Sequence, residues 1–114
     1  MKRGREEEEF DDYDILYDCE KGDIDMVKVQ EFIERGIDLN VKDDYKRTLL
    51  QFAAHFGCVE VAKVLIQNGA DVNAVDEYKW TAIHYAAQNG HVGVAKVLIQ
   101  KGADVNAVGK NNWT

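Results

Sequence analysis

The sequence predicts an all-α fold, a solenoid of stacked helix pairs joined by projecting hairpin loops. Three observations support this expectation. A unit of 33 residues repeats along the 114-residue chain, apolar residues recur at helical spacing within each unit, and glycines stand where the helices should end. The chain has nine glycines and no proline, which permits uninterrupted helices. Its length suits one small domain.

The internal repeat is the strongest signal. The run VAKVLIQNGADVNA begins at Val61. A second copy begins at Val94 and differs only in having Lys101 where the first has Asn68. Residues 42–74 and 75–107 agree at about 21 of 33 positions, well above what shared composition would produce. Such a fixed period indicates an array of identical structural units, each packed on its neighbours.

A fainter copy precedes these two units. A glycine, an aspartate and an asparagine recur at the same period, first as Gly36, Asp38 and Asn40. This copy has two extra residues, which we place near residues 23–25, in the turn between its helices, because turns tolerate insertions. The resulting domain organisation is an acidic flexible tail at 1–14, a degenerate capping unit at 15–41, two units at 42–74 and 75–107, and the start of a truncated unit at 108–114.

Each unit should hold two helices and a loop. In the last full unit, Thr81 can cap the first helix and Gly90 can end it in a left-handed conformation. The second helix should close at Gly102. Its expected buried face consists of Val92, Ala95, Leu98 and Ile99. The polar segment that follows, with Asp104 and Asn106 for side-chain-to-backbone turns, should project as an extended hairpin.

These residues resemble a known family. The run TAIHYAAQNGHVGVAKVLIQKGADVNA from Thr81 is similar to an ankyrin repeat, as is TLLQFAAHFGCVEVAKVLIQNGADVNA from Thr48, and ILYDCEKGDIDMVKVQEFIERGIDLN from Ile15 looks like a degenerate unit. The resemblance covers about residues 15 to 114. It implies a concave binding surface made of hairpin tips and first helices, and a role in binding another protein.

The chain departs from the family pattern at two kinds of position. The threonine-proline-leucine-histidine signature lacks its proline in both units, and Gln51 replaces the histidine once, whereas His84 should bond locally near Thr81. The glycine usual at the hairpin bend is a lysine at Lys46 and Lys79. A positive φ costs energy at lysine, so we expect a strained or altered bend.

Composition and motifs argue against other functions. A net charge of −7 does not suit a nucleic-acid binder, and no apolar run is long enough to span a membrane. No metal site is expected, because His55 and Cys58 lie in one unit and His84 and His91 in the next, without the paired spacing of zinc ligands. No nucleophile with a base and no phosphate-binding loop is recognisable, so we expect neither an enzyme nor a cofactor. Two cysteines and a polar amino terminus favour an intracellular, cytoplasmic setting.

The candidate partner-binding residues lie on the exposed side, mostly where the units differ. By resemblance they occupy the hairpin tips and the outer face of the first helices, and several are aromatic or arginine, the types enriched in binding hot spots. They are Asp44, Tyr45, Arg47, His55, Phe56, Glu77, Tyr78, Trp80, Gln88, Asn89, Lys110, Asn111 and Trp113. A purely structural alternative is that Tyr45 and Tyr78 pack hairpin against hairpin and that Trp80 covers a helix end.

Three other functions are compatible with the sequence. The chain could be a fragment, the regulatory or substrate-recruiting portion of a larger enzyme or channel. It could instead be architectural and self-associate through an uncapped carboxyl-terminal end, because a terminal repeat without a polar outer face exposes the core surface. Binding of a small aromatic phosphate by Lys79 and Trp80 is a further alternative.

Overall fold

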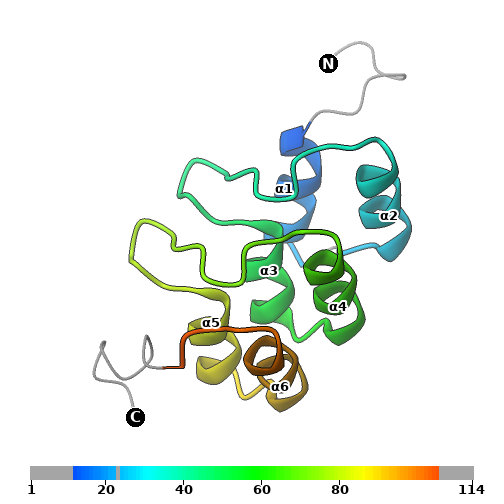
Figure 1. The fold of residues 1–114 in the computed structure, drawn as a ribbon. Coiled ribbons are helices and arrows are strands. Elements are labelled where there is room, and N and C mark those ends of the chain that lie inside the picture. The colour runs from blue at the N-terminus through cyan, green and yellow to red at the C-terminus, as the bar shows by residue number, and fades with distance from the viewer. Residues whose placement is uncertain (1–11, 23, 106–114) are drawn as a thin grey trace.

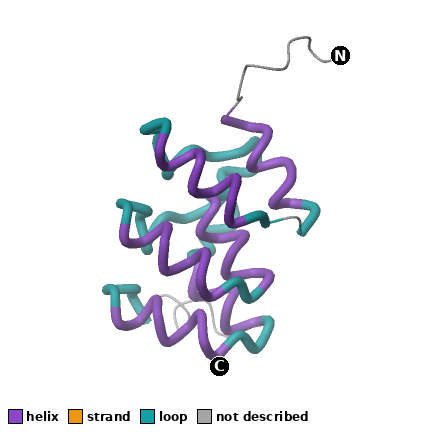
Figure 2. The backbone as a smooth tube through the Cα atoms, turned by 90° about the vertical axis from the view of Figure 1, so that its right-hand side faces the viewer, coloured by secondary structure: helices purple, strands orange, loops and turns teal. Residues whose placement is uncertain are grey.

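Three consecutive helix pairs stack along one direction in the computed structural model (Figure 1), which describes residues 12–22 and 24–105. In order, the helices are α1 (Asp12–Glu20), α2 (Met26–Glu34), α3 (Leu49–Phe56), α4 (Val59–Gln67), α5 (Ala82–Gln88) and α6 (Val92–Gln100). The first helices α1, α3 and α5 form one row and the second helices another (Figure 2). Residues 1–11, 23 and 106–114 lie outside the described residues, and with them most of the expected tail, Asn106 and the start of a further unit.

The first helices of the two full units begin at threonine caps. The amide of Gln51 donates to the Thr48 hydroxyl at 3.3 Å, and the Gln51 side chain accepts from the Thr48 amide at 2.9 Å. In the next unit the ring nitrogen Nδ1 of His84 accepts from the Thr81 amide at 2.9 Å. Such reciprocal caps satisfy amides that a helix start leaves unpaired. The expected local role of His84 is confirmed, and Gln51 performs the same role without a histidine.

Helix α1 starts earlier than expected. It begins at Asp12, three residues before the position at which the first unit was expected to begin. A helix limited to residues 15–20 would lose the conformational entropy of its first turn and gain few hydrogen bonds in return, which is unfavourable. The helix therefore extends into the acidic stretch that composition alone assigned to the tail.

The core lies between the two rows of helices. Leu50, Leu65 and Leu98 are at most 1% exposed and Phe32 is fully buried. Alanines at the centre of the first helices, Ala53 and Ala86, are fully buried as well. Their small side chains allow α3 to approach α1 and α5, so the array stacks closely.

The predicted buried face of α6 was wrong in two positions. Val92 is 64% exposed and Ile99 51% exposed, whereas Val94, Val97 and Leu98 are buried. In α4 the residues 33 positions earlier are Val59 and Ile66, both partly buried, and α4 packs on α6. No described element covers α6 in the same way. Periodicity located the apolar residues but not which of them a neighbour would cover.

The hairpin loops bend at the two lysines. Lys46 has φ of 67° and Lys79 has φ of 65°, so both take the left-handed conformation that a glycine would occupy, at a cost of about 1 kcal/mol each. The amide of Lys46 donates to the Asp43 carbonyl, and the amide of Lys79 to the Asp76 carbonyl. The hairpin therefore bends as it would with a glycine at this position. The loops turn back on themselves without any β-strand in the part of the chain that the structure describes.

Polar side chains tie each loop to the next. The Asn40 side chain donates to the Gly69 carbonyl at 3.2 Å and accepts from the Asp71 amide at 2.7 Å. One unit later, Asn73 repeats these contacts with the Gly102 carbonyl and the Asp104 amide. These contacts hold the loops in register with the helices and thereby set the spacing of the hairpins.

Candidate functional site

Three cavities lie along the side on which the loops project from the first helices. The first, of about 200 Å³, is lined by Leu16, Tyr17, Glu20, Asp43, Asp44 and Tyr45. The second, of about 100 Å³, is lined by Glu20, Arg47, Gln51, Phe52, His55, Phe56 and Tyr85. The third, of about 320 Å³, is lined by Tyr78, Trp80 and Tyr85.

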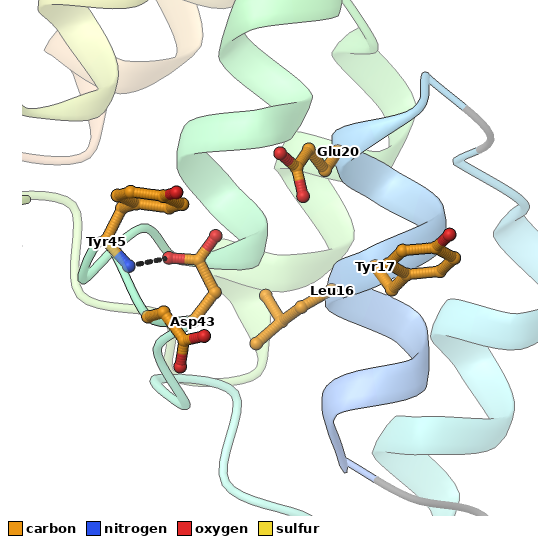
Figure 3. Close-up of a pocket in the computed structure, with 6 residues that line it drawn as sticks. Leu16, Tyr17, Glu20, Asp43 and Tyr45 are labelled. Carbon is orange, nitrogen blue, oxygen red and sulfur yellow. Dashed lines mark hydrogen bonds between the residues drawn. The ribbon is translucent and has the colours of Figure 1, made fainter.

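Neighbouring cavities have lining residues in common. Glu20 lines both the first and the second cavity, and Tyr85 lines both the second and the third. The lining residues thus come from α1, α3 and α5 and from the loops, which project beside these helices (Figure 1). We call this surface the loop groove. Figure 3 shows its first cavity, where Leu16 and Glu20 extend from α1 toward Asp43 and Tyr45 on the loop.

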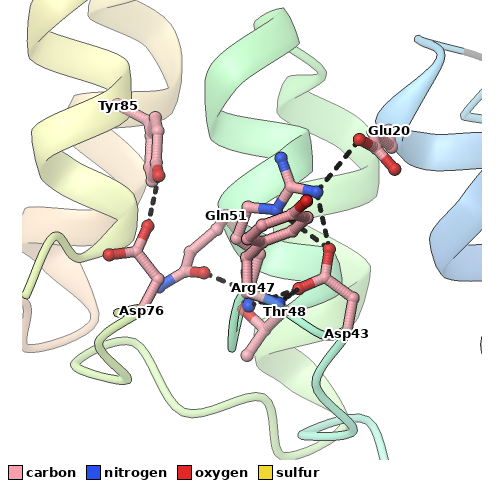
Figure 4. A network of polar contacts seen from close by, with 8 residues as sticks. Glu20, Asp43, Arg47, Thr48, Gln51, Asp76 and Tyr85 are labelled. Carbon is pink, nitrogen blue, oxygen red and sulfur yellow. Dashed lines mark hydrogen bonds and ion pairs between the residues drawn. The ribbon is translucent and has the colours of Figure 1, made fainter. Parts of the chain in front are cut away.

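Asp43 organises the first loop. Its Oδ1 accepts from the backbone amides of Tyr45 and Arg47, each at 2.9 Å. Its Oδ2 lies 2.8 Å from the Arg47 guanidinium (Figure 4). One carboxylate therefore fixes the loop backbone and an arginine side chain together, which makes this part of the groove wall well defined.

Arg47 lies between two aromatic rings. Its guanidinium carbon is 4.9 Å from the Tyr45 ring centre and 4.8 Å from that of Phe52, distances at which a cation is attracted to the ring. It also pairs with Glu20 at 3.1 Å, joining the first loop to α1. Burial opposes the charge on Arg47, but Asp43 and Glu20 outweigh it, so its pKa is raised above the ordinary value.

The second loop is also held by an aspartate, but this aspartate has a different side-chain partner. Asp76 is 3% exposed, and its Oδ1 accepts from the amides of Tyr78 and Trp80 at 2.9 and 3.0 Å. Its Oδ2 accepts from the Tyr85 hydroxyl (Figure 4). Burial, together with the bond to Asp76 and its negative charge, raises the pKa of Tyr85. Tyr85 therefore stays a neutral donor.

Trp80 forms a half-buried wall of the third cavity. Its ring stacks on His84 with centres 5.5 Å apart and planes 17° apart, and it meets Tyr85 edge-on at 5.0 Å. The alternative that Trp80 covers a helix end agrees with this stacking at one end of α5, and Trp80 also lines the third cavity. Tyr45 and Tyr78 are 51% and 66% exposed, so large parts of both rings face the solvent.

His55 links α3 to α5 at the groove floor. Its ring meets Phe56 and Tyr85 edge-on, with centres 4.5 and 5.8 Å apart. Asn89 and His91 reach back to its ring and to its carbonyl, at 3.3 and 3.1 Å. Burial, with smaller effects from His91 and Arg47, lowers the pKa of His55. This histidine is therefore neutral near pH 7.

The structure brings most of the sequence-predicted residues together. Seven of them line the loop groove: Asp44, Tyr45, Arg47, His55, Phe56, Tyr78 and Trp80. Glu77, Gln88 and Asn89 are exposed and lie outside the three cavities. The predicted residues Lys110, Asn111 and Trp113 lie outside the described part of the chain.

Sequence reasoning missed Tyr17, Glu20 and Tyr85. A signal for Glu20 existed, because the glycines after α1 and α3, Gly22 and Gly57, differ by 35 positions rather than 33. That offset aligns Glu20 with His55, which is one of the predicted partner-binding residues. Tyr85 was treated as part of the scaffold, and its exposure into the groove follows only from the helix packing.

No group of three or more histidine, cysteine, aspartate or glutamate side chains in the described residues could hold a metal ion. Among the same residues, no helix combines the length and the apolar character needed to cross a bilayer.

The fold and the groove define the class of protein. Stacked helix pairs repeating every 33 residues, with loops projecting along one side, make this chain a repeat solenoid with an extended lateral surface. A family model of three ankyrin repeats matches residues 15–108, and the chain belongs to the ankyrin repeat family. No curated protein matches the chain. Ankyrin repeats are generally non-enzymatic modules that bind other proteins.

Proposed function

We propose that this chain binds a partner protein through the loop groove. The supporting observation is that the three cavities adjoin, since the first two share Glu20 and the last two share Tyr85 as lining residues. Exposed aromatic rings border it, with Tyr45 51%, Phe56 39% and Tyr78 66% exposed. Tyrosines of this kind bury a large area at low entropic cost and are enriched in binding hot spots.

The test is affinity capture from cell extract with the native chain and a Tyr45→Ala/Tyr78→Ala variant. These positions suit the test because the loops are held by the backbone amides of Tyr45 and Tyr78, which alanine keeps. A Val27→Ala variant is the matched control, since Val27 is 71% exposed on α2. We expect capture of the same proteins by the native chain and the control, and loss with the double variant. Equal capture by all three would contradict the proposal, provided circular dichroism shows that all are folded.

A second candidate function is self-association through the outer face of α6. The supporting observation is that Val92 and Ile99 are exposed, whereas the equivalent residues of α4 are partly buried beside α6. Two such faces can pair symmetrically. Sedimentation should then show a mass that rises with concentration, and Ile99→Lys should abolish the rise. A constant mass for the native chain would exclude this candidate.

A further inference from the structure

The two ends of the loop groove differ in chemistry. Among the described residues, the first cavity is lined by three carboxylates, those of Glu20, Asp43 and Asp44, and by no lysine or arginine. The described residues that line the third are all aromatic: Tyr78, Trp80 and Tyr85. A partner segment that spans the groove therefore meets negative charge at the α1 end and rings at the α5 end.

Part of the negative charge is already neutralised within the chain. Asp43 uses both carboxylate oxygens on its own loop and on Arg47. Glu20 uses one oxygen on Arg47 and keeps a side chain that is 48% exposed. Asp44 is exposed, and its side chain has no hydrogen bond or ion pair with another described residue. Asp44 and the second Glu20 oxygen are thus left to bind a cation.

The apolar walls of the first cavity suit a long cationic side chain. Leu16 is buried at its base, and the rings of Tyr17 and Tyr45 border it. Long cationic side chains lay their carbon stems on such surfaces and place the charged end beside carboxylates. The nearby cations do not fill the cavity, because Lys21 lies over the Tyr17 ring at 4.8 Å and Arg47 is paired with Asp43 and Glu20.

We infer that the loop groove binds an extended partner segment that places an arginine or lysine in the first cavity and a bulky apolar side chain in the third. Charge complementarity selects the basic residue at the α1 end. The uncharged aromatic residues that line the third cavity, in the part of the chain that the structure describes, select the apolar one. This inference rests on the proposed function and adds the chemistry and the orientation of the partner.

The test is selection from a display library of random short peptides against the full chain. We expect the selected peptides to combine an arginine or lysine with an aromatic or large aliphatic residue. Their affinity for Asp44→Asn and Glu20→Gln variants should fall by up to about fivefold, as for an exposed ion pair. It should stay unchanged for Glu34→Gln, which removes the same charge from an exposed position on α2. Higher salt should weaken binding to the native chain more than to Asp44→Asn.

The outcomes separate the two proposals. Groove-binding peptides without a preference for basic residues, or with equal affinity for Asp44→Asn, Glu20→Gln and Glu34→Gln, would overturn the inferred chemistry and leave groove binding intact. Selected peptides that bind Tyr45→Ala/Tyr78→Ala as tightly as the native chain would overturn both. Failure to select any peptide would overturn the inferred extended segment. Thermal unfolding followed by circular dichroism confirms that each variant is folded.

Discussion

The hydroxyl of Tyr85 donates a hydrogen bond to the buried carboxylate of Asp76. One unit earlier, the equivalent aspartate, Asp43, meets Arg47 instead. The aspartate thus has a side-chain partner in both loops. That partner is a tyrosine on the following helix in one loop and an arginine four residues along the chain in the other. Because each pairing places different side chains in the groove, the repeat keeps its backbone while its surface changes.

Removing the tyrosine hydroxyl should destabilise the fold. In Tyr85→Phe, the Oδ2 atom of Asp76 loses its donor while the carboxylate stays buried. We expect the free energy of unfolding in urea to fall by about 1 to 3 kcal/mol. Tyr78→Phe is the control, because Tyr78 is 66% exposed, and it should change stability little. Equal effects of the two substitutions would contradict the role assigned to the hydrogen bond.

The residues that pair with the loop aspartate should be exchangeable between the two units if they are exchanged together. Arg47 and Trp80 occupy equivalent positions, as do Phe52 and Tyr85. Arg47→Trp alone leaves Asp43 without its cation, whereas Phe52→Tyr supplies a hydroxyl where the next unit has one. We expect Arg47→Trp/Phe52→Tyr to be more stable than Arg47→Trp by about 1 kcal/mol. If Phe52→Tyr has the same effect on the native chain, the two positions are not coupled.

Two equivalent glycines should tolerate alanine unequally. Gly57 and Gly90 both have positive φ, 75° and 72°. A Cβ on Gly57 would lie 2.6 Å from Nδ1 of His91, whereas one on Gly90 would meet nothing within 4 Å. Gly90→Ala should cost about 1 kcal/mol from backbone strain alone, and Gly57→Ala should cost more because the His91 ring must move. Thermal unfolding compares them, and an equal loss would show that the ring moves freely.

Acid should weaken the α3–α5 contact through His55. Its pKa in the folded state lies below the ordinary value of 6.5, so the unfolded chain binds the proton more readily. The contribution to stability is complete well above pH 6.5 and decreases as the pH falls below that value. In His55→Gln, the loss of unfolding free energy between about pH 7 and pH 5 should be smaller than in the native chain. An identical loss in both proteins would rule out this effect of His55.

The sequence was sufficient for the fold because the repeat fixes where units begin and end. The threonine caps and the glycines after the helices follow from local rules, whereas the bends at Lys46 and Lys79 are kept despite the local cost of a positive φ at lysine. The groove was only partly predictable. Tyr45 and Tyr78 could be placed from the register alone, but the meeting of Glu20 with Arg47 joins residues 27 positions apart in different units. Such a contact depends on how the units stack.

Periodicity also could not decide which apolar residues of α6 are covered. Val92 and Val94 both fit an amphipathic helix, yet Val94 is fully buried and Val92 is 64% exposed. The difference arises from the neighbouring unit rather than from the helix itself. Errors of this kind are therefore expected where the described array ends.

The amide of Glu77 donates to the carbonyl of Tyr45 at 3.1 Å, so at this point the two neighbouring loops are joined backbone to backbone. Any residue except proline can supply that amide, and any residue can supply the carbonyl. The side chains at both positions are thereby free to be exchanged without loosening the connection between loops. The chain is a favourable starting point for redesign, because a new binding specificity can be introduced at these positions while the spacing of the loops is retained.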